Sequence, residues 1–365
     1  MSCPTLYVAI TNHGFGHATR AASVAAAVRA MMPEVELILA TTAPRWLLDC
    51  YLPTNYHYRP RAFDIGIIQA DSLKMDLDST LEKLQQIRAQ QDAIVAAEAE
   101  FLRQQQVDLV LADIPPLATA IAHGADIPCW MMSNFGWDFI YRAWGGEFEQ
   151  IADWIGDWFS HCDRLFRLPF HEPMSAFPVV QDVGLTGGTP QYSAADLQAR
   201  WNLETVAEKT ALLTFGGLGL QSIPYRELAN FSDWQFMTFD HQAPDLTNLL
   251  KLPKHELRPV DVMPLCGRVV SKPGFSTFSE ACRLDVPIVT ITRDDFAEGP
   301  VLVNKMKDHA WHQVMSPENF IQNKWEFLRQ PLNPPRTDQE LAKNGNEQIA
   351  GAIVEYLTKR TNTSS

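Results

Sequence analysis

Short apolar runs alternate with alanine-rich or amphipathic segments along this chain, and the alternation occurs twice. The first series opens with an apolar run at residues 5–11, followed by an alanine-rich segment at 17–32. A glycine-rich stretch at 183–190 interrupts the pattern, and apolar runs resume at residue 210. Strands separated by helices form parallel sheets with right-handed crossovers. The sequence therefore predicts an α/β fold with two doubly wound, Rossmann-like domains whose strand ends face each other across a cleft.

The predicted domain boundaries follow these changes in composition. Residues 1–182 are expected to form an N-terminal domain, 183–205 a linker and 206–335 a C-terminal domain. Residues 336–365 are expected to form a last helix, from about Asp338, and a polar tail; this helix is able to pack back on the N-terminal domain. Within the C-terminal domain, the segment "HELRPV" at residues 255–260 is predicted to be a strand.

The excess of acidic over basic residues argues against a nucleic-acid partner. The chain has 30 Lys and Arg against 43 Asp and Glu, a formal net charge of −13, whereas nucleic-acid binding depends on clustered basic side chains. The six cysteines are spaced singly, so no CxxC zinc or redox motif is present. The first residues do not resemble a signal peptide, and no apolar run is long enough to span a membrane. We expect a cytoplasmic protein without a nucleic-acid partner.

The loop after the first predicted strand contains two glycines and two histidines, in the sequence "TNHGFGHATR". Gly14 and Gly16 allow a tight turn and a close approach of the backbone to a ligand, so both are candidate nucleotide-sugar-binding residues. The N-terminus of the helix that follows favours a phosphate or a carboxylate. A histidine at a strand end can take a proton from a hydroxyl near neutral pH, so His17 and His13 are both candidate general bases. Alternatively, one of the histidines caps the helix or hydrogen-bonds a neighbouring loop.

Asp113 ends an apolar strand in the sequence "DLVLADIPPLA". A carboxylate at a strand end can orient an imidazole and stabilise its charged form, as a general-base pair requires. Capping of the helix that starts near Pro116 explains the aspartate equally well. Asp113 is therefore a candidate partner for a catalytic histidine.

Asn134 and Asp138 follow a later strand and lie among aromatic residues. Aromatic rings stack on sugar rings, and these polar side chains bind hydroxyls, so both are candidate acceptor-side residues. The aromatic residues of segment 137–158 are expected to pack mainly in the core. Lining of an acceptor groove and contact with a membrane surface remain open for this segment.

The C-terminal half contains the sequence "VVSKPGFSTFSEACRLD". Lys272 and Gly274 lie in a loop, and Ser276 and Thr277 lie at the N-terminus of the next predicted helix, which is an arrangement that binds anions. Glu280 follows one turn later and can accept hydrogen bonds from both hydroxyls of a ribose. A capping box explains the hydroxyl residues and Glu280, but not Lys272 and Gly274.

Two more strand ends in this half offer ligand-binding groups. Gly216 and Gly217 end the strand in "LLTFGGLG", where backbone N–H groups can cradle a pyrophosphate. Asp294 and Glu298, in "RDDFAEGP", are acceptors suited to sugar hydroxyls. These four residues complete the predicted nucleotide-sugar site.

Together these motifs resemble the two-domain GT-B glycosyltransferases, and more closely the N-terminal, glycosyltransferase-like region of plant L-arabinokinases. A more distant similarity is to the peptidoglycan N-acetylglucosaminyltransferases. The resemblance covers about residues 6–328 and is carried, in order, by "NHGFGHATR", "QADSLKMD", "SNFGWDFIY", "SHCDRLFRLPFHEPMSAF", "KPGFSTFSEA" and "RDDFAEGPVLVNKM". In the plant proteins a sugar-kinase domain follows this region, so the resemblance does not imply kinase activity.

The resemblance implies transfer of a sugar from a nucleotide sugar, with a UDP-linked donor expected, and without a metal or other cofactor. His17 matches the histidine that closes the first loop, and Asp113 lies where related enzymes carry its carboxylate partner. Glu280 matches the ribose-binding glutamate. The other implied contacts are with the phosphates (Ser276 and Thr277), the nucleobase (Arg258 and Val260) and the donor sugar (Asp294 and Glu298).

Two other functions remain open at this point. A nucleotide-sugar epimerase or hydrolase uses the same fold and works without an acceptor. A non-catalytic, nucleotide-sugar-binding regulatory protein binds the nucleotide without turnover. The sequence does not specify whether an acceptor is a small molecule, a lipid or a glycan, and peripheral contact with a membrane remains open.

Overall fold

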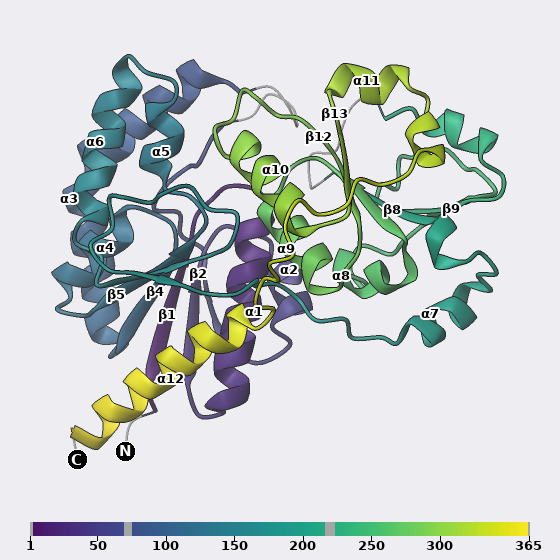
Figure 1. Ribbon diagram of the computed structural model, residues 1–365. Coiled ribbons are helices and arrows are strands. Elements are labelled where there is room, and N and C mark those ends of the chain that lie inside the picture. Colours follow the sequence, from purple (N-terminus) through teal and green to yellow (C-terminus); the bar gives the residue numbers. More distant parts are fainter. Residues whose placement is uncertain (1–2, 69–74, 216–222, 364–365) are drawn as a thin grey trace. The chain divides into compact units, whose positions relative to one another are not determined.

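The computed structural model (Figure 1) describes three stretches of the chain, residues 3–68, 75–215 and 223–363. The described residues divide into two compact units. The first unit contains residues 3–68, 75–187 and 342–363, and the second contains 188–215 and 223–341. Among the described residues, no helix combines the length and the apolar character needed to cross a membrane.

The first unit is built on a parallel sheet with the strand order β3-β2-β1-β4-β5-β6-β7. Its strands are β1 (Thr5–Ile10), β2 (Glu36–Ala40), β3 (His57–Arg59), β4 (Leu109–Asp113), β5 (Cys129–Ser133), β6 (Arg164–Arg167) and β7 (Val180–Asp182). Every residue of the central strands β1, β4 and β5 is buried. Strands covered on both faces consist of continuous apolar runs, which explains why the sequence pattern identified them. The strand order reverses between β1 and β4, where ligands bind in folds of this type.

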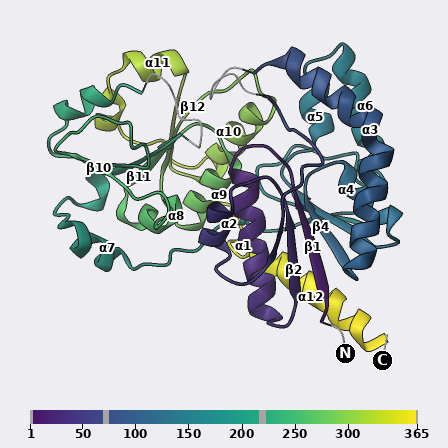
Figure 2. The same cartoon turned by 180° about the vertical axis from the view of Figure 1, so that it is seen from behind.

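Helices cover both faces of this sheet (Figures 1 and 2). Helices α1, α2 and α12 pack together on one face, and α3, α4 and α6 pack together on the other, with α5 against α6. Their bounds are α1 (Gly16–Met31), α2 (Arg45–Tyr51), α3 (Leu77–Gln104), α4 (Leu117–Gly124), α5 (Trp137–Arg142), α6 (Glu147–Phe159) and α12 (Gly345–Thr363). The alanines of α1 are small and mostly buried, so its backbone can lie close to the sheet.

The last helix, α12, belongs to the first unit although the second unit precedes it in the chain. It packs along α1, and Arg360 forms an ion pair with Asp108 at 2.9 Å. The returning chain is fixed before the helix begins, because the Leu185 N–H donates to the carbonyl of Ala342 at 2.7 Å. Both ends of the described chain therefore lie in the same unit.

The second unit is built on another parallel sheet, with the strand order β10-β9-β8-β11-β12-β13. Its strands are β8 (Thr210–Thr214), β9 (Gln235–Thr238), β10 (Leu249–Lys251), β11 (Arg268–Ser271), β12 (Ile288–Ile291) and β13 (His312–Met315). Its helices are α7 (Ala194–Trp201), α8 (Pro259–Val262), α9 (Phe275–Arg283), α10 (Glu298–His309) and α11 (Pro317–Gln322), with short 3₁₀ turns η1 (Ala207–Lys209), η2 (Tyr225–Asn230), η3 (Met263–Leu265) and η4 (Glu326–Arg329). The prediction of two doubly wound parallel sheets is confirmed.

Two predicted elements differ from the structure. Residues 255–260 do not form a strand: Arg258 is the N-cap of α8 and Pro259 is its first helical residue, a position that suits the fixed φ of proline. The strand at this edge is β10, a few residues earlier. The last helix begins at Gly345 rather than near Asp338. In the first segment, Leu257 and Val260 are buried as in a strand, whereas residues 338–344 before the last helix are mostly exposed.

Candidate functional site

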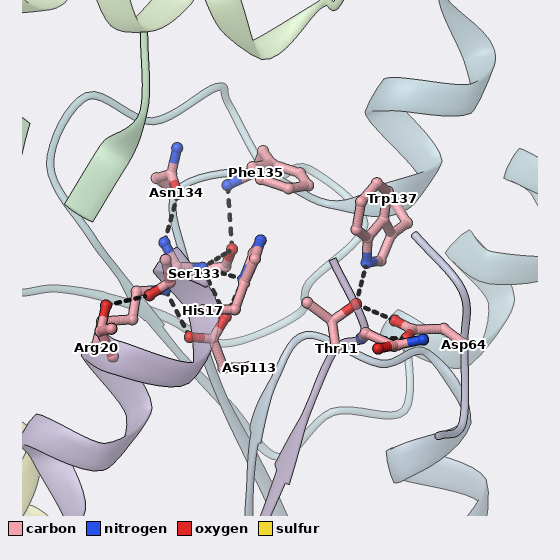
Figure 3. A network of polar contacts seen from close by, with 12 residues as sticks. Thr11, His17, Arg20, Asp64, Asp113, Ser133, Asn134, Phe135 and Trp137 are labelled. Carbon is pink, nitrogen blue, oxygen red and sulfur yellow. Dashed lines mark hydrogen bonds and ion pairs between the residues drawn. The ribbon is translucent and has the colours of Figure 1, made fainter. Parts of the chain in front are cut away.

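In the first unit, the ends of two neighbouring strands bring together two of the candidate catalytic residues. β1 pairs with β4, with Ile10 opposite Asp113, and α1 begins at Gly16 just beyond β1. His17 Nδ1 thus lies 2.8 Å from Asp113 Oδ1, although 96 positions separate the two residues in sequence (Figure 3). Helix capping, the alternative role of Asp113, is not observed, because the N-cap of α4 is Pro116 and makes no side-chain cap.

Arg20, which the sequence analysis did not single out, completes this pair. It lies one turn after His17 on α1 and is only 2% exposed. Its Nε and Nη2 donate to the two carboxylate oxygens of Asp113 at 2.5 and 2.6 Å. Burial opposes ionisation of Asp113, but the charge of Arg20 and the interactions with Arg20 and His17 outweigh it and hold the pKa of Asp113 below its usual value. Asp113 is therefore ionised inside the fold.

The Nδ1 atom of His17 faces both members of this ion pair. It lies 2.8 Å from Asp113 Oδ1, which only accepts hydrogen bonds, and 2.9 Å from Arg20 Nη2, which only donates them. Asp113 therefore favours a proton on Nδ1, while Arg20 disfavours it. The other ring nitrogen, Nε2, points away from the ion pair (Figure 3) and has no hydrogen-bond partner among the described residues. With the proton on Nδ1, Nε2 carries the lone pair that a general base needs.

His13 lies beside His17 but has a different environment. Its Nδ1 accepts a long hydrogen bond from the N–H of Ile67, at 3.4 Å, and its ring lies edge-on to Trp137 at 5.2 Å. A Cβ atom at Gly66, which has φ +57°, would lie 2.4 Å from the Cβ of His13, so this position requires glycine. Gly14 also has positive φ, +61°. His13 thus has the alternative role considered for one of the two histidines, a hydrogen bond to a neighbouring loop.

A second buried carboxylate supports the loop that carries the histidines. Asp64 Oδ1 accepts a hydrogen bond from the Asn12 N–H at 2.9 Å, and its Oδ2 accepts one from the hydroxyl of Thr11 (Figure 3). The indole N–H of Trp137 donates to the same hydroxyl at 3.0 Å. Burial raises the pKa of Asp64 above its usual value. No sequence pattern pointed to Asp64, because its role depends on contacts between distant segments.

The two acceptor-side candidates have different surroundings. Asn134 is 1% exposed, and its Oδ1 accepts a hydrogen bond from Arg20 Nη1 at 2.8 Å, so it supports the ion pair. Asp138 lies half-buried in the first turn of α5, and burial raises its pKa. Burial also raises the pKa of the neighbouring Glu172 to about 6. Trp137 is fully buried, which agrees with core packing of this aromatic residue.

In the second unit, the phosphate-side candidates lie around the start of α9. Gly274 is the N-cap, Ser276 and Thr277 lie in the first turn, and Lys272 lies in the loop between β11 and α9. The capping-box alternative is wrong, since neither hydroxyl residue occupies the N-cap. Burial, and to a smaller extent the charge of Arg293, lowers the pKa of Lys272 to about 8.

Glu280 lies in the middle of α9 and is 3% exposed. Its Oε1 accepts a hydrogen bond from the Gly188 N–H at 2.8 Å, and Arg283 donates to the carbonyl of the same glycine at 2.7 Å. No hydrogen bond to Oε2 occurs among the described residues. Burial raises the pKa of Glu280 to about 7, against the opposite effects of the Gly188 N–H and of the charges on Arg258 and Arg283. Glu280 therefore holds the segment at Gly188 and retains one oxygen for another partner.

Replacing Glu280 with glutamine is expected to stabilise the ligand-free protein at pH 8. The wild-type side chain has a folded pKa of about 7 against an ordinary value of 4.5, so the folded state keeps a proton that the unfolded state releases. Its contribution to stability falls as pH rises from about 4.5 to 7, by about 3 kcal/mol in total. Urea unfolding from pH 4.5 to 8 measures this difference, with exposed Glu204→Gln as the control. Parallel pH profiles for wild type and E280Q would contradict the raised pKa.

The nucleobase candidates are largely engaged within their own segment. Both the N–H and the C=O of Arg258 bond to Asp261, and the two side chains form an ion pair at 2.6 Å. Arg258 also donates to the carbonyl of Thr189 at 2.5 Å. Val260 is completely buried in α8. Arg258 thus fixes the start of α8.

The remaining candidates follow two strands, β12 and β8. Asp294 is exposed in the loop after β12, and Glu298 is the first residue of α10. Gly216 and Gly217, after β8, lie outside the described residues. The structure therefore places Lys272 and Asp294 in the loops that follow β11 and β12, without assigning a role to either.

Comparison with known proteins places the chain among GT-B proteins. No protein-family profile matches it. Over 359 residues, 96% of this chain, it is 30% identical to the L-arabinokinase of Arabidopsis thaliana. The chain spans about a third of the length of that relative, 34%.

Two solved structures illustrate the similarity of fold. UGT89C1 of Arabidopsis thaliana, in complex with UDP, has a TM-score of 0.62 at 12% identity, with 97% of this chain and 99% of that chain covered. A candidate UDP-N-acetylglucosamine 2-epimerase from Listeria monocytogenes has a TM-score of 0.56 at 12% identity, with 100% and 98% covered. The chain therefore has the GT-B fold and is related in sequence to part of the plant L-arabinokinase.

Proposed function

We propose that the protein is a glycosyltransferase that moves a sugar from a nucleotide-sugar donor, UDP-linked, to an acceptor hydroxyl. The observation that carries the proposal is the buried contact between His17 Nδ1 and Asp113 Oδ1 at the ends of β1 and β4. A carboxylate on one imidazole nitrogen prepares the other nitrogen to take a proton. The GT-B fold and the relationship to a sugar-metabolic protein also support it.

In the proposed reaction, the first unit supplies the base. His17 Nε2 takes the proton of the acceptor hydroxyl while the oxygen of that hydroxyl attacks the anomeric carbon of the donor sugar. The bond from that carbon to the phosphate oxygen breaks, and the nucleoside diphosphate leaves with the electron pair. A single displacement of this kind inverts the configuration at the anomeric carbon. Asp113 stabilises the imidazolium that forms.

The second unit is proposed to bind the nucleotide. The oxygen of Glu280 that does not contact Gly188 accepts a hydrogen bond from a ribose hydroxyl. The N-terminus of α9, with Ser276 and Thr277, binds the phosphates, and Lys272 stabilises the negative charge of the leaving group. These groups are proposed to replace a metal ion in this role.

The thermal unfolding midpoint in the presence of nucleotides tests the proposal. UDP and UDP-sugars are expected to raise it, corresponding to about 2.7 kcal/mol at a hundred times the dissociation constant. Glu280→Gln keeps an oxygen for Gly188 but replaces the other carboxylate oxygen with an NH₂ group, so its shift with UDP is expected to be smaller. Glu204→Gln, at an exposed position of the same unit, is the control. Equal shifts in all three proteins would argue against ribose binding by Glu280.

Product analysis separates the proposed transferase from its alternatives. Incubation of UDP-sugars alone produces a new sugar or a free sugar in the case of an epimerase or a hydrolase. A transferase consumes the donor only with an acceptor. Binding of UDP without turnover by any acceptor in a panel of phenols, sugars and lipids would instead indicate a regulatory protein.

A further inference from the structure

Arg293, in the loop after β12, is a buried arginine without a matching buried carboxylate. It is 7% exposed, and its Nε and Nη2 atoms have no hydrogen-bond partner among the residues that the structure describes. The nearest carboxylate oxygen in an ion pair is that of Asp295, at 3.9 Å from Nε, and the Asp295 side chain is 52% exposed. The ring of Phe296 lies 4.7 Å from the guanidinium and offsets part of the cost of burial.

A second cation lies at the neighbouring strand end. β11 and β12 are adjacent and parallel, with Ser271 opposite Thr290, so Lys272 and Arg293 both follow the carboxyl ends of these strands. Neither Lys272 nor Arg293 makes a hydrogen bond to a carboxylate among the described residues. The hydroxyl of Ser271, directly before Lys272, is also buried, and no described residue forms a hydrogen bond with it. The positive charges of the two side chains interact, since Arg293 contributes to the lowered pKa of Lys272.

A buried Arg293 with only an exposed carboxylate at 3.9 Å, beside a half-buried Lys272, destabilises the ligand-free protein, because both cations lose hydration and they repel each other. Such an arrangement is retained where an anion compensates it. The N-terminus of α9 lies at the same strand end, since the helix begins three residues after Lys272, and its N–H groups favour the same kind of ligand. Burial lowers the pKa of Arg293, and the charges of Asp295 and Glu298 offset this effect only in part.

We propose that Arg293, together with Lys272, binds the diphosphate group of the nucleotide. This inference rests on the proposed function and adds a residue to it: Arg293 donates hydrogen bonds from Nε and Nη2 to a phosphate oxygen. A planar guanidinium binds phosphate with two parallel hydrogen bonds, whereas Lys272 acts as a point charge. Binding of the diphosphate satisfies the unpaired atoms of Arg293 and stabilises the leaving group during transfer.

The experiment compares Arg293→Met with Arg226→Met, which makes the same chemical change at an exposed arginine of the second unit. Binding of UDP, inorganic pyrophosphate and uridine to the full chain is measured by calorimetry at constant ionic strength. We expect R293M to weaken the binding of UDP and of pyrophosphate by roughly tenfold to a hundredfold, because a charged hydrogen bond is lost. Uridine, which has no phosphate, is expected to bind both variants and the wild type equally.

A second readout separates binding from a structural role. Because Nε and Nη2 of Arg293 are buried without a hydrogen-bond partner among the described residues, R293M is expected to leave the unfolding midpoint of the ligand-free protein unchanged or to raise it. A lower midpoint, or weaker uridine binding, would show that Arg293 supports the fold and would overturn the proposal. Equal affinity of wild type and R293M for pyrophosphate would overturn it as well.

Pyrophosphate also distinguishes failure of this inference from failure of the proposed function. Pyrophosphate binding can depend on Arg293 while neither UDP nor UDP-sugars bind the wild type. This result would confirm an anion site at Arg293 and show that the proposed UDP-linked donor is wrong. If UDP binds the wild type and R293M equally, the proposed donor stands and the role of Arg293 is wrong.

Discussion

Replacing His17 with alanine is expected to lower the rate of sugar transfer by about two to four orders of magnitude, the usual contribution of a general base. His17 is 7% exposed and contacts Asp113 through Nδ1, so the variant removes both the proton acceptor and its oriented hydrogen bond. The measurement is UDP release from UDP-glucose with a panel of phenols, sugars and lipids as acceptors. Binding of UDP is expected to remain unchanged, because the side chains proposed to bind the nucleotide belong to the second unit.

His13→Ala is the matched control for this prediction. His13 lies in the same loop, but its Nδ1 contacts the Ile67 N–H rather than a carboxylate. Its replacement is expected to lower the rate by about tenfold or less, as for a group that does not exchange the proton. A larger effect for His13 than for His17 would reverse the assignment of the base. If both variants transfer sugar at the wild-type rate, neither histidine of the first unit acts in catalysis.

Replacing Arg20 with methionine is expected to destabilise the protein by about 3–5 kcal/mol, because it leaves a buried carboxylate without its partner. Arg20 donates to both oxygens of Asp113, and their side chains are 2% and 0% exposed. It also supplies hydrogen bonds to Asn134 and Ser133. Urea unfolding at pH 7 measures the loss.

Arg142→Met is the control for Arg20→Met, since Arg142 forms an ion pair with Asp153 in which the side chains are 52% and 69% exposed. An exposed pair of this kind contributes about 1 kcal/mol or less. Combining Arg20→Met with Asp113→Leu removes both buried charges and is expected to recover much of the stability, but not the transfer activity. Equal losses for Arg20→Met and Arg142→Met would mean that the buried ion pair does not stabilise the fold.

The fold was predictable because its elements have local signals. β1, β4 and β5 are buried on both faces and consist of apolar residues in succession, while the alanines of α1 mark a helix that packs closely on a sheet. Alternation of such segments specifies parallel sheets whatever the details of packing. The segment 255–260 was wrongly predicted as a strand for the same reason: its apolar residues are buried, but Pro259 begins a short helix.

The candidate site was predictable only where a residue type and a strand end coincide. His17 and Asp113 follow β1 and β4, and the pairing of these strands brings them together. Arg20 and Asp64 gave no such signal. Their roles follow from which segments pack against them, and segments about 50 to 90 residues distant in sequence supply their partners.

The sequence by itself determined the two α/β halves, the positions of most helices and strands, and the kinds of side chain at the strand ends, because each depends on residues close together in the chain. Only the tertiary structure decided which charges meet: Arg20 with Asp113, and Glu280 with the Gly188 backbone. It also buried Nε and Nη2 of Arg293, which have no hydrogen-bond partner in the part of the chain that the structure describes. Burial alters the energy of these groups far more than their neighbours in sequence do, and burial is a property of the folded chain.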